Sequence, residues 1–181
     1  VEWDRCAFKP TLAADDPRSP HDPHYLHVDE IPEPWIGDRR LQSMLYLTDT
    51  DETMGPLQVL SQPYREQLAG TRTEWSWAEQ DDYPLELVPG PAGSMVIWEN
   101  RVPHSSGWNV SGRPRFTQLL TMSPEGDDAT RARRVEEWRT GAAPKLYPVR
   151  TGQMDPEPWA AVPLSPLGEK LLGLRHWEVD S

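Results

Sequence analysis

Twenty prolines spread over 181 residues are the feature that most constrains how this chain can fold. Each proline fixes its own φ angle and removes a backbone hydrogen-bond donor, so long uninterrupted helices are disfavoured. This excludes coiled coils, helical bundles and helical repeats. Nine tryptophans argue against disorder, because such large side chains bury too much apolar area to remain in water. The sequence therefore predicts a compact, loop-rich and mainly β domain.

The charge balance narrows the range of partners. With 29 acidic against 18 basic residues, the surface should repel nucleic acids and anionic membranes, which leaves a small molecule as the expected ligand. The single cysteine, Cys6, excludes an internal disulfide and a multi-cysteine zinc site. No secretion signal opens the sequence, so we expect a cytoplasmic protein. The sequence does not indicate the oligomeric state.

About eight short strands separated by Gly/Pro turns are predicted, followed by two short helices. The expected strands are Cys6–Leu12, Tyr25–Asp29, Leu41–Thr48, Gly55–Leu60, Leu85–Val88, Ser94–Glu99, Val102–Trp108 and Arg115–Met122. The expected helices are Ala129–Thr140 and a segment that starts at Ser165-Pro166 and stops at Gly173. Many short strands of this kind are typical of a sandwich or jelly roll. We therefore expect a core in residues 1–125 and a helical, Pro-rich extension in residues 126–181 that packs on it.

Three residues have the types and spacing of a metal site. His27 and Asp29 are two apart, so on a strand both side chains point to the same face. His104 lies on a later strand that a folded-back sheet would bring beside them. Two histidines and one carboxylate leave three positions open on Fe(II), as in non-haem iron oxygenases. Taken singly, such a His-x-Asp pair is more often a surface pair, and a lone histidine such as His104 is more often half-buried and bonded to a carbonyl.

Arg115 suggests an anion site. It opens the last predicted strand and shares a face with Thr117 and Leu119. A guanidinium that projects into an apolar barrel needs an anionic partner, and its planar fork suits a carboxylate. The alternative is a surface arginine at the start of a strand, an interpretation that suits Arg113 better.

Four segments together resemble the phytanoyl-CoA dioxygenase (PhyH) family of iron- and 2-oxoglutarate-dependent oxygenases. They are His27-Val28-Asp29; Tyr46-Leu47-Thr48-Asp49 through Gly55-Pro56-Leu57-Gln58-Val59-Leu60; Gly93-Ser94-Met95-Val96-Ile97-Trp98; and His104-Ser105-Ser106-Gly107-Trp108-Asn109-Val110-Ser111-Gly112-Arg113-Pro114-Arg115. The resemblance implies a double-stranded β-helix (a jelly-roll or cupin-like fold). It also implies a catalytic Fe(II) held by His27, Asp29 and His104, with O2 and 2-oxoglutarate as co-substrates.

In this resemblance the distal carboxylate of 2-oxoglutarate pairs with Arg115. Strand facing further suggests hydrogen bonds to the co-substrate from Ser111 or Thr117 and from Gln42 or Tyr46. Four tryptophans are candidate substrate contacts: Trp98 and Trp108 beside the site, where core packing is an equal alternative, and Trp75 and Trp77 in an insertion that could form a lid. Related halogenases have a small residue in the place of Asp29, so its carboxylate favours hydroxylation, with desaturation or ring formation as other outcomes.

Two departures from the family pattern bear on substrate choice. The usual Pro-Gly-Ser-His turn is replaced here by Leu60-Ser61-Gln62-Pro63-Tyr64, which suggests a different rim. Only 26 residues precede His27, so we expect that the helical region before it in the family is missing. The leading hypothesis is hydroxylation of a small molecule such as an amino acid or a natural-product intermediate. The alternatives are a cupin-like metal oxygenase or isomerase without 2-oxoglutarate, and a non-catalytic jelly-roll binding module.

Overall fold

The computed structural model describes residues 2–23, 25–29, 40–68, 82–122, 126–141 and 163–177. The chain divides into two compact units, of which one spans Glu2–Ser123 and the other holds Pro124–Ser181. All residues of the predicted metal and anion sites fall in the first unit. That the C-terminal extension packs on the core stays a prediction.

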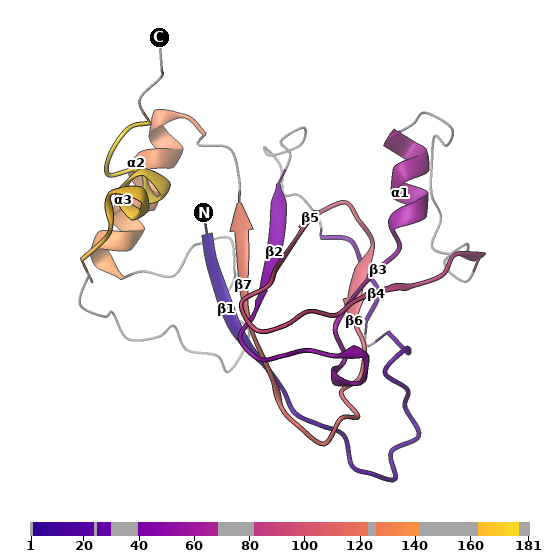
Figure 1. The fold of residues 1–181 in the computed structure, drawn as a ribbon. Coiled ribbons are helices and arrows are strands. Elements are labelled where there is room, and N and C mark those ends of the chain that lie inside the picture. The colour runs from indigo at the N-terminus through magenta and orange to yellow at the C-terminus, as the bar shows by residue number, and fades with distance from the viewer. Residues whose placement is uncertain are drawn as a thin grey trace, which may run out of the picture. The chain divides into compact units, whose positions relative to one another are not determined.

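Two antiparallel sheets build the unit Glu2–Ser123 (Figure 1). The four-stranded sheet has the order β1-β7-β2-β5, formed by Glu2–Lys9, Arg115–Met122, Leu41–Tyr46 and Met95–Glu99. The three-stranded sheet has the order β4-β3-β6, formed by Glu86–Val88, Leu57–Val59 and His104–Ser106. The prediction of a mainly β, jelly-roll protein is confirmed.

The alternation of side chains along β7 defines the inner face of the larger sheet. Arg115 and Thr117 are buried, whereas Phe116 between them is 42% exposed. In the register between β2 and β7, Tyr46 lies opposite Thr117 and Met44 opposite Leu119, so the same face continues onto β2. The core forms where this face meets β3 of the smaller sheet: Met44 and Tyr46 pack with Leu57. Polar side chains that point inward therefore enter the space between the sheets.

The segment between β1 and β2 departs from the prediction. We expected a strand at Tyr25–Asp29, but the structure has two isolated bridges, Pro23 with Gly107 and His27 with His104. Proline has no N–H to donate to a ladder, which explains why pairing is interrupted at Pro23. The bridge at His27 is complete, because the two histidines exchange both backbone hydrogen bonds, at 3.0 and 2.8 Å.

Two short helices interrupt the strands of the first unit. The 3-10 helix η1 (Glu52–Met54) begins after Asp51, whose side chain accepts a hydrogen bond from the Thr53 N–H, and ends at Gly55 with φ of 63°. Helix α1 (Ser61–Leu68) follows β3 directly. We had assigned no helix to this polar segment, whose apolar positions are too few to show a helical period.

Both predicted helices of the second unit are confirmed. Helix α2 spans Asp128–Thr140 and is capped by Asp127, whose side chain accepts from the Thr130 N–H. Helix α3 spans Pro166–Leu172 and is capped by Ser165. The Arg134 Nε donates to the Leu172 carbonyl at 2.8 Å, which ties the two helices together. Among the described residues, no helix is long and apolar enough to cross a membrane.

Candidate active site

The structure brings His27, Asp29 and His104 together. The backbone bridge between His27 and His104 sets their rings side by side, with centroids 4.5 Å apart. Asp29 lies 3.6 Å from the His27 Nε2 and 3.8 Å from the His104 Nε2, measured to its carboxylate oxygens. One possible ligand atom from each residue lies within 4.8 Å of the others. The cluster therefore has the compactness and the donor types that a divalent transition metal needs.

Hydrogen bonds orient both imidazoles for coordination. The Nδ1 of His27 lies 2.9 Å from the Tyr25 carbonyl, and the Nδ1 of His104 lies 2.9 Å from the Val102 carbonyl. A carbonyl only accepts, so each Nδ1 carries a proton and each Nε2 is the nitrogen placed to bind a metal. Burial lowers the pKa of His104, which favours the neutral imidazole. Both histidines thus offer Nε2 toward the carboxylate of Asp29.

Two side chains from the inner face of the larger sheet support this cluster. The Gln42 amide group donates to the Asp29 carboxylate. The Trp98 ring lies 5.3 Å from that of His104, centroid to centroid. The Gln42 Oε1 and the Trp98 Nε1 are buried without a hydrogen-bond partner among the described residues. Gln42, which we predicted to contact the co-substrate, thus has its contact with a candidate metal ligand.

A buried cation lies on the same inner face. Arg115 opens β7, is only 3% exposed, and donates through Nη1 to the Gly55 carbonyl at 2.5 Å. Its Nε is buried without a partner in the described part of the chain. Only glycine fits at position 55, for two reasons. Its φ is +63°, and a Cβ there would stand 2.2 Å from the Gly107 oxygen. Burial lowers the pKa of Arg115, the expected effect on a cation removed from water.

Two neighbours of Arg115 on this face, Thr117 and Tyr46, differ in how fully their hydroxyl groups are hydrogen-bonded. Thr117 is fully buried, and its Oγ1 has no hydrogen-bond partner among the described residues. The Tyr46 hydroxyl donates to the Val88 carbonyl at 2.5 Å and accepts from the Leu57 N–H at 3.3 Å. Burial also raises the pKa of Tyr46, so it stays a neutral phenol. Thr117 therefore has free hydrogen-bonding capacity, whereas the Tyr46 hydroxyl already links the two sheets.

Two further polar residues close to Arg115 escaped the sequence analysis. Ser106 follows His104 by two residues on β6, so both point inward. Lys9 lies opposite Arg115 in the pairing of β1 with β7. Its Nζ donates to the Ser106 Oγ at 2.6 Å and to the Gly107 carbonyl. The two-residue spacing from His104 was a usable signal for Ser106, but the sequence carries none for Lys9.

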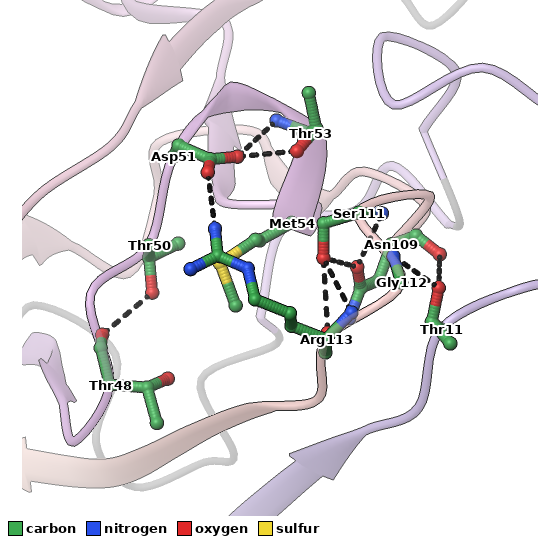
Figure 2. Close-up of polar contacts among 10 residues, drawn as sticks. All are labelled: Thr11, Thr48, Thr50, Asp51, Thr53, Met54, Asn109, Ser111, Gly112 and Arg113. Atoms are coloured by element: carbon green, nitrogen blue, oxygen red, sulfur yellow. Dashed lines mark hydrogen bonds and ion pairs between the residues drawn. The ribbon is translucent and has the colours of Figure 1, made fainter.

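The predicted residue Ser111 belongs to a loop network at the edge of the barrel (Figure 2). Its Oγ donates to the Asn109 Oδ1 at 2.8 Å and approaches the Arg113 carbonyl at 3.0 Å. Arg113, 62% exposed at its side chain, pairs with Asp51 at 2.8 Å, as expected of a surface arginine. A role of Ser111 toward the co-substrate stays a prediction.

The four predicted tryptophans separate into two groups. Trp98 lies beside His104, and Trp108 packs under the Arg18 guanidinium at 3.9 Å, with the Lys9 Nζ 5.9 Å from its ring. Trp75 and Trp77 lie outside the described residues. Contacts of any of them with a substrate stay predictions.

The chain matches known proteins in family and in fold. The domain model of the phytanoyl-CoA dioxygenase (PhyH) family matches residues 3–117. No curated protein sequence matches the chain. The solved structure of AviO1 from Streptomyces viridochromogenes Tue57 is similar with a TM-score of 0.50 and 21% identity, over 66% of this chain and 48% of that one. The structure of EvdMO1 is similar with a TM-score of 0.50 and 17% identity, over 67% of this chain and 26% of that one.

These likenesses differ in what they establish. The chain spans about half the length of AviO1 and about a quarter of EvdMO1. Because the identities are so low, these two likenesses show a shared fold and nothing more. The family model covers well over half of the chain and includes the cluster of His27, Asp29 and His104 together with Arg115. The chain therefore belongs to the phytanoyl-CoA dioxygenase (PhyH) family.

Proposed function

We propose that this chain is an Fe(II)- and 2-oxoglutarate-dependent oxygenase that hydroxylates a C–H bond of a small molecule. The observation that carries the proposal is the presence of two complementary sites on the facing sheets. One is the compact cluster of His27, Asp29 and His104, and the other is the buried Arg115 with unsatisfied donor capacity. The PhyH family uses Fe(II), 2-oxoglutarate and O2.

The metal cluster fits Fe(II) by the chemistry of its donors. Two neutral imidazoles and one carboxylate on one side of the ion leave the opposite positions open, the arrangement found in non-haem Fe(II) oxygenases. His27 and His104 would bind through Nε2, because their Nδ1 atoms are bonded to backbone carbonyls. Gln42 would hold the carboxylate of Asp29 in place. Such outer hydrogen bonds set ligand orientation.

The anion site fits a dicarboxylate that also reaches the metal. A guanidinium whose Nε lacks a partner inside a pocket is costly unless an anion completes its hydrogen bonds. Thr117 adds a second unsatisfied buried group beside it. His104 and Ser106 are two residues apart on β6, and Ser106 is hydrogen-bonded to Lys9, the residue paired with Arg115. A small dicarboxylate such as 2-oxoglutarate would place its distal carboxylate at Arg115 and its keto-acid end at the metal cluster.

Each residue then has a definite task. Bound Fe(II) with 2-oxoglutarate and O2 supplies an oxidant strong enough for an unactivated C–H bond. His27, Asp29 and His104 hold the metal, while Arg115 fixes the distal carboxylate and so the orientation of the co-substrate. The Trp98 ring beside His104 would shield that side of the reacting centre from water. Because a carboxylate occupies position 29, we favour hydroxylation over halogenation.

The substrate is proposed only by class. The net charge of −11 disfavours polyanionic partners, and exposed or half-buried tryptophans suit an apolar or aromatic surface. An amino acid or a natural-product intermediate meets both conditions.

Succinate release tests this proposal. The Fe(II)-loaded protein is incubated with 2-oxoglutarate, O2 and a panel of small molecules, and succinate is measured beside the metal content of the purified protein. We expect succinate formation that depends on a substrate, on Fe(II) and on Arg115. Full turnover by an Arg115→Ala variant would instead support a cupin-like oxygenase or isomerase without 2-oxoglutarate. A protein that takes up no stoichiometric iron, cobalt or nickel would be a binding module.

A further inference from the structure

A second basic side chain, that of Lys9, lies beside Arg115. Lys9 lies on the inner face of β1, directly opposite Arg115 in the antiparallel pairing with β7. The Asn109 side chain holds this position by donating to the Lys9 carbonyl at 3.1 Å. The Lys9 Nζ makes two hydrogen bonds, to the Ser106 Oγ at 2.6 Å and to the Gly107 carbonyl. An ammonium group has three N–H donors, so one stays available for a ligand.

The charges around Lys9 do not balance. Burial, and then repulsion by Arg115, lower the pKa of Lys9 from its ordinary 10.5 to about 7. The elements packed around it contribute Arg115 from β7, the Trp108 ring from the loop after β6, and Arg18 on that same ring. The Arg18 guanidinium is in turn paired with the Asp16 carboxylate. Among the described residues, no carboxylate acts on Lys9 to hold its proton.

An anion would complete this arrangement. Two basic side chains from paired strands converge beside the Ser106 hydroxyl and the unsatisfied Thr117 hydroxyl. A carboxylate with four lone-pair sites can accept from the Arg115 fork and from the third N–H of Lys9 together. Once it is there, its negative charge favours the protonated lysine.

We propose that Lys9 and Arg115 together bind the distal carboxylate of 2-oxoglutarate, and that the co-substrate enters with uptake of a proton at Lys9. The inference rests on the proposed function. It adds a positioning residue to that function, and it makes co-substrate affinity dependent on pH. The proton comes from solvent and stays on Nζ, between the carboxylate, the Ser106 hydroxyl and the Gly107 carbonyl.

The number of protons taken up on binding follows from the protonation state of Lys9 in the ligand-free protein. A group with a pKa of about 7 is about half protonated at pH 7 and about one-tenth protonated at pH 8. Full protonation in the complex therefore requires about half a proton per site at pH 7 and about 0.9 at pH 8. The affinity of the co-substrate should weaken as the pH rises above 7, because more of the lysine must first be protonated.

Isothermal titration calorimetry tests this inference. The Ni(II)-loaded protein, which does not turn over, is titrated with 2-oxoglutarate in buffers of different ionisation enthalpy at pH 7 and pH 8. The slope of observed enthalpy against ionisation enthalpy counts the protons taken up. Wild type is compared with Lys9→Met, which keeps the length of the side chain but removes the amine, and with Lys9→Arg, which keeps a permanent charge. Lys170→Met, in helix α3, is the matched lysine control.

The expected results are specific to each variant. Wild type should take up more protons than Lys9→Met, by about half a proton at pH 7 and nearly one at pH 8. Lys9→Met should bind 2-oxoglutarate roughly tenfold more weakly, the loss expected for one charge-assisted hydrogen bond. Lys9→Arg should restore most of the affinity without the proton uptake. Lys170→Met should match wild type in both quantities.

Two outcomes would overturn the inference, and they differ from failure of the proposed function. Equal proton uptake by wild type and Lys9→Met, with tight binding in both, removes Lys9 from the site while the oxygenase proposal stands. Equal loss of affinity in Lys9→Arg and Lys9→Met shows that the charge is not what binds. Absence of any 2-oxoglutarate binding by the Ni(II)-loaded wild type refutes the proposed function and this inference with it. Circular dichroism and Ni(II) uptake confirm that each variant is folded.

Discussion

Replacing Arg115 by methionine should weaken the binding of 2-oxoglutarate strongly while changing the stability of the fold little. Two charge-assisted hydrogen bonds to a carboxylate are worth about 3 kcal/mol or more in a buried pocket, so the Kd for 2-oxoglutarate should rise at least about a hundredfold. In the ligand-free protein the same change removes a buried cation whose Nε lacks a partner and whose Nη1 bonds only the Gly55 carbonyl among the described residues. Replacing such a charge with an apolar side chain of similar size is often neutral or stabilising. We therefore expect the free energy of unfolding to fall by less than about 1 kcal/mol, or to rise.

Calorimetry with the Ni(II)-loaded protein and urea unfolding of the ligand-free protein measure the two effects. Arg113→Met is the matched control, because Arg113 is exposed and pairs with Asp51 on the surface. A surface pair contributes at most about 1 kcal/mol, so this variant should change neither quantity much. An affinity loss of less than about threefold in Arg115→Met, or an equal loss in the control, would refute the assignment of the anion pocket. A large fall in the free energy of unfolding in Arg115→Met, without one in Arg113→Met, would show that Arg115 has a structural role instead.

Three further predictions follow from the contacts around the site. Gln42→Leu removes the amide that donates to Asp29, so Ni(II) affinity measured by competition with a chelator should weaken roughly tenfold, and unchanged affinity would contradict this role. Gly107→Ala places a Cβ 2.0 Å from the Pro20 carbonyl oxygen, so urea unfolding should show a loss of about 2 kcal/mol, whereas wild-type stability would mean that the loop yields easily. Between pH 7 and pH 10 the unfolded chain binds a proton at Lys9 that the folded chain has lost, so the free energy of unfolding of the metal-free protein should rise with pH. Lys9→Met should flatten that rise, and an equal pH dependence in both proteins would count against a buried, neutralised lysine.

The closeness of His27 to Asp29 and the inward direction of Arg115 could be predicted from the sequence because the alternation of extended backbone is local. Side chains two residues apart on extended backbone share a face, so the spacing of His27 and Asp29 carries structural information by itself. The same rule placed Arg115 with Thr117, and both are buried on one inner face. The prediction that a late strand lies beside the early segment is confirmed at the bridge between His27 and His104.

The partners of these residues could not be predicted, because they depend on long-range register. Lys9 meets Arg115 only through the pairing of β1 with β7, which joins residues more than a hundred positions apart. Gln42 reaches Asp29 across a connection that strand facing cannot describe, and its contact with the co-substrate stays a prediction. Ser111 was assigned by facing as if it lay on a strand, yet its bonds lie within a loop. Loop conformation follows side-chain hydrogen bonding and escapes periodicity.

An anaerobic titration of the metal-free protein with Fe(II) and then 2-oxoglutarate tests the central claim most directly. Chelation of Fe(II) by the keto acid in this site should produce a weak visible metal-to-ligand charge-transfer band. We expect that band in wild type, with one Fe(II) and one 2-oxoglutarate per chain, and its loss in His104→Ala. A wild-type protein that gives no band, or a band of equal intensity in His104→Ala, would contradict the account.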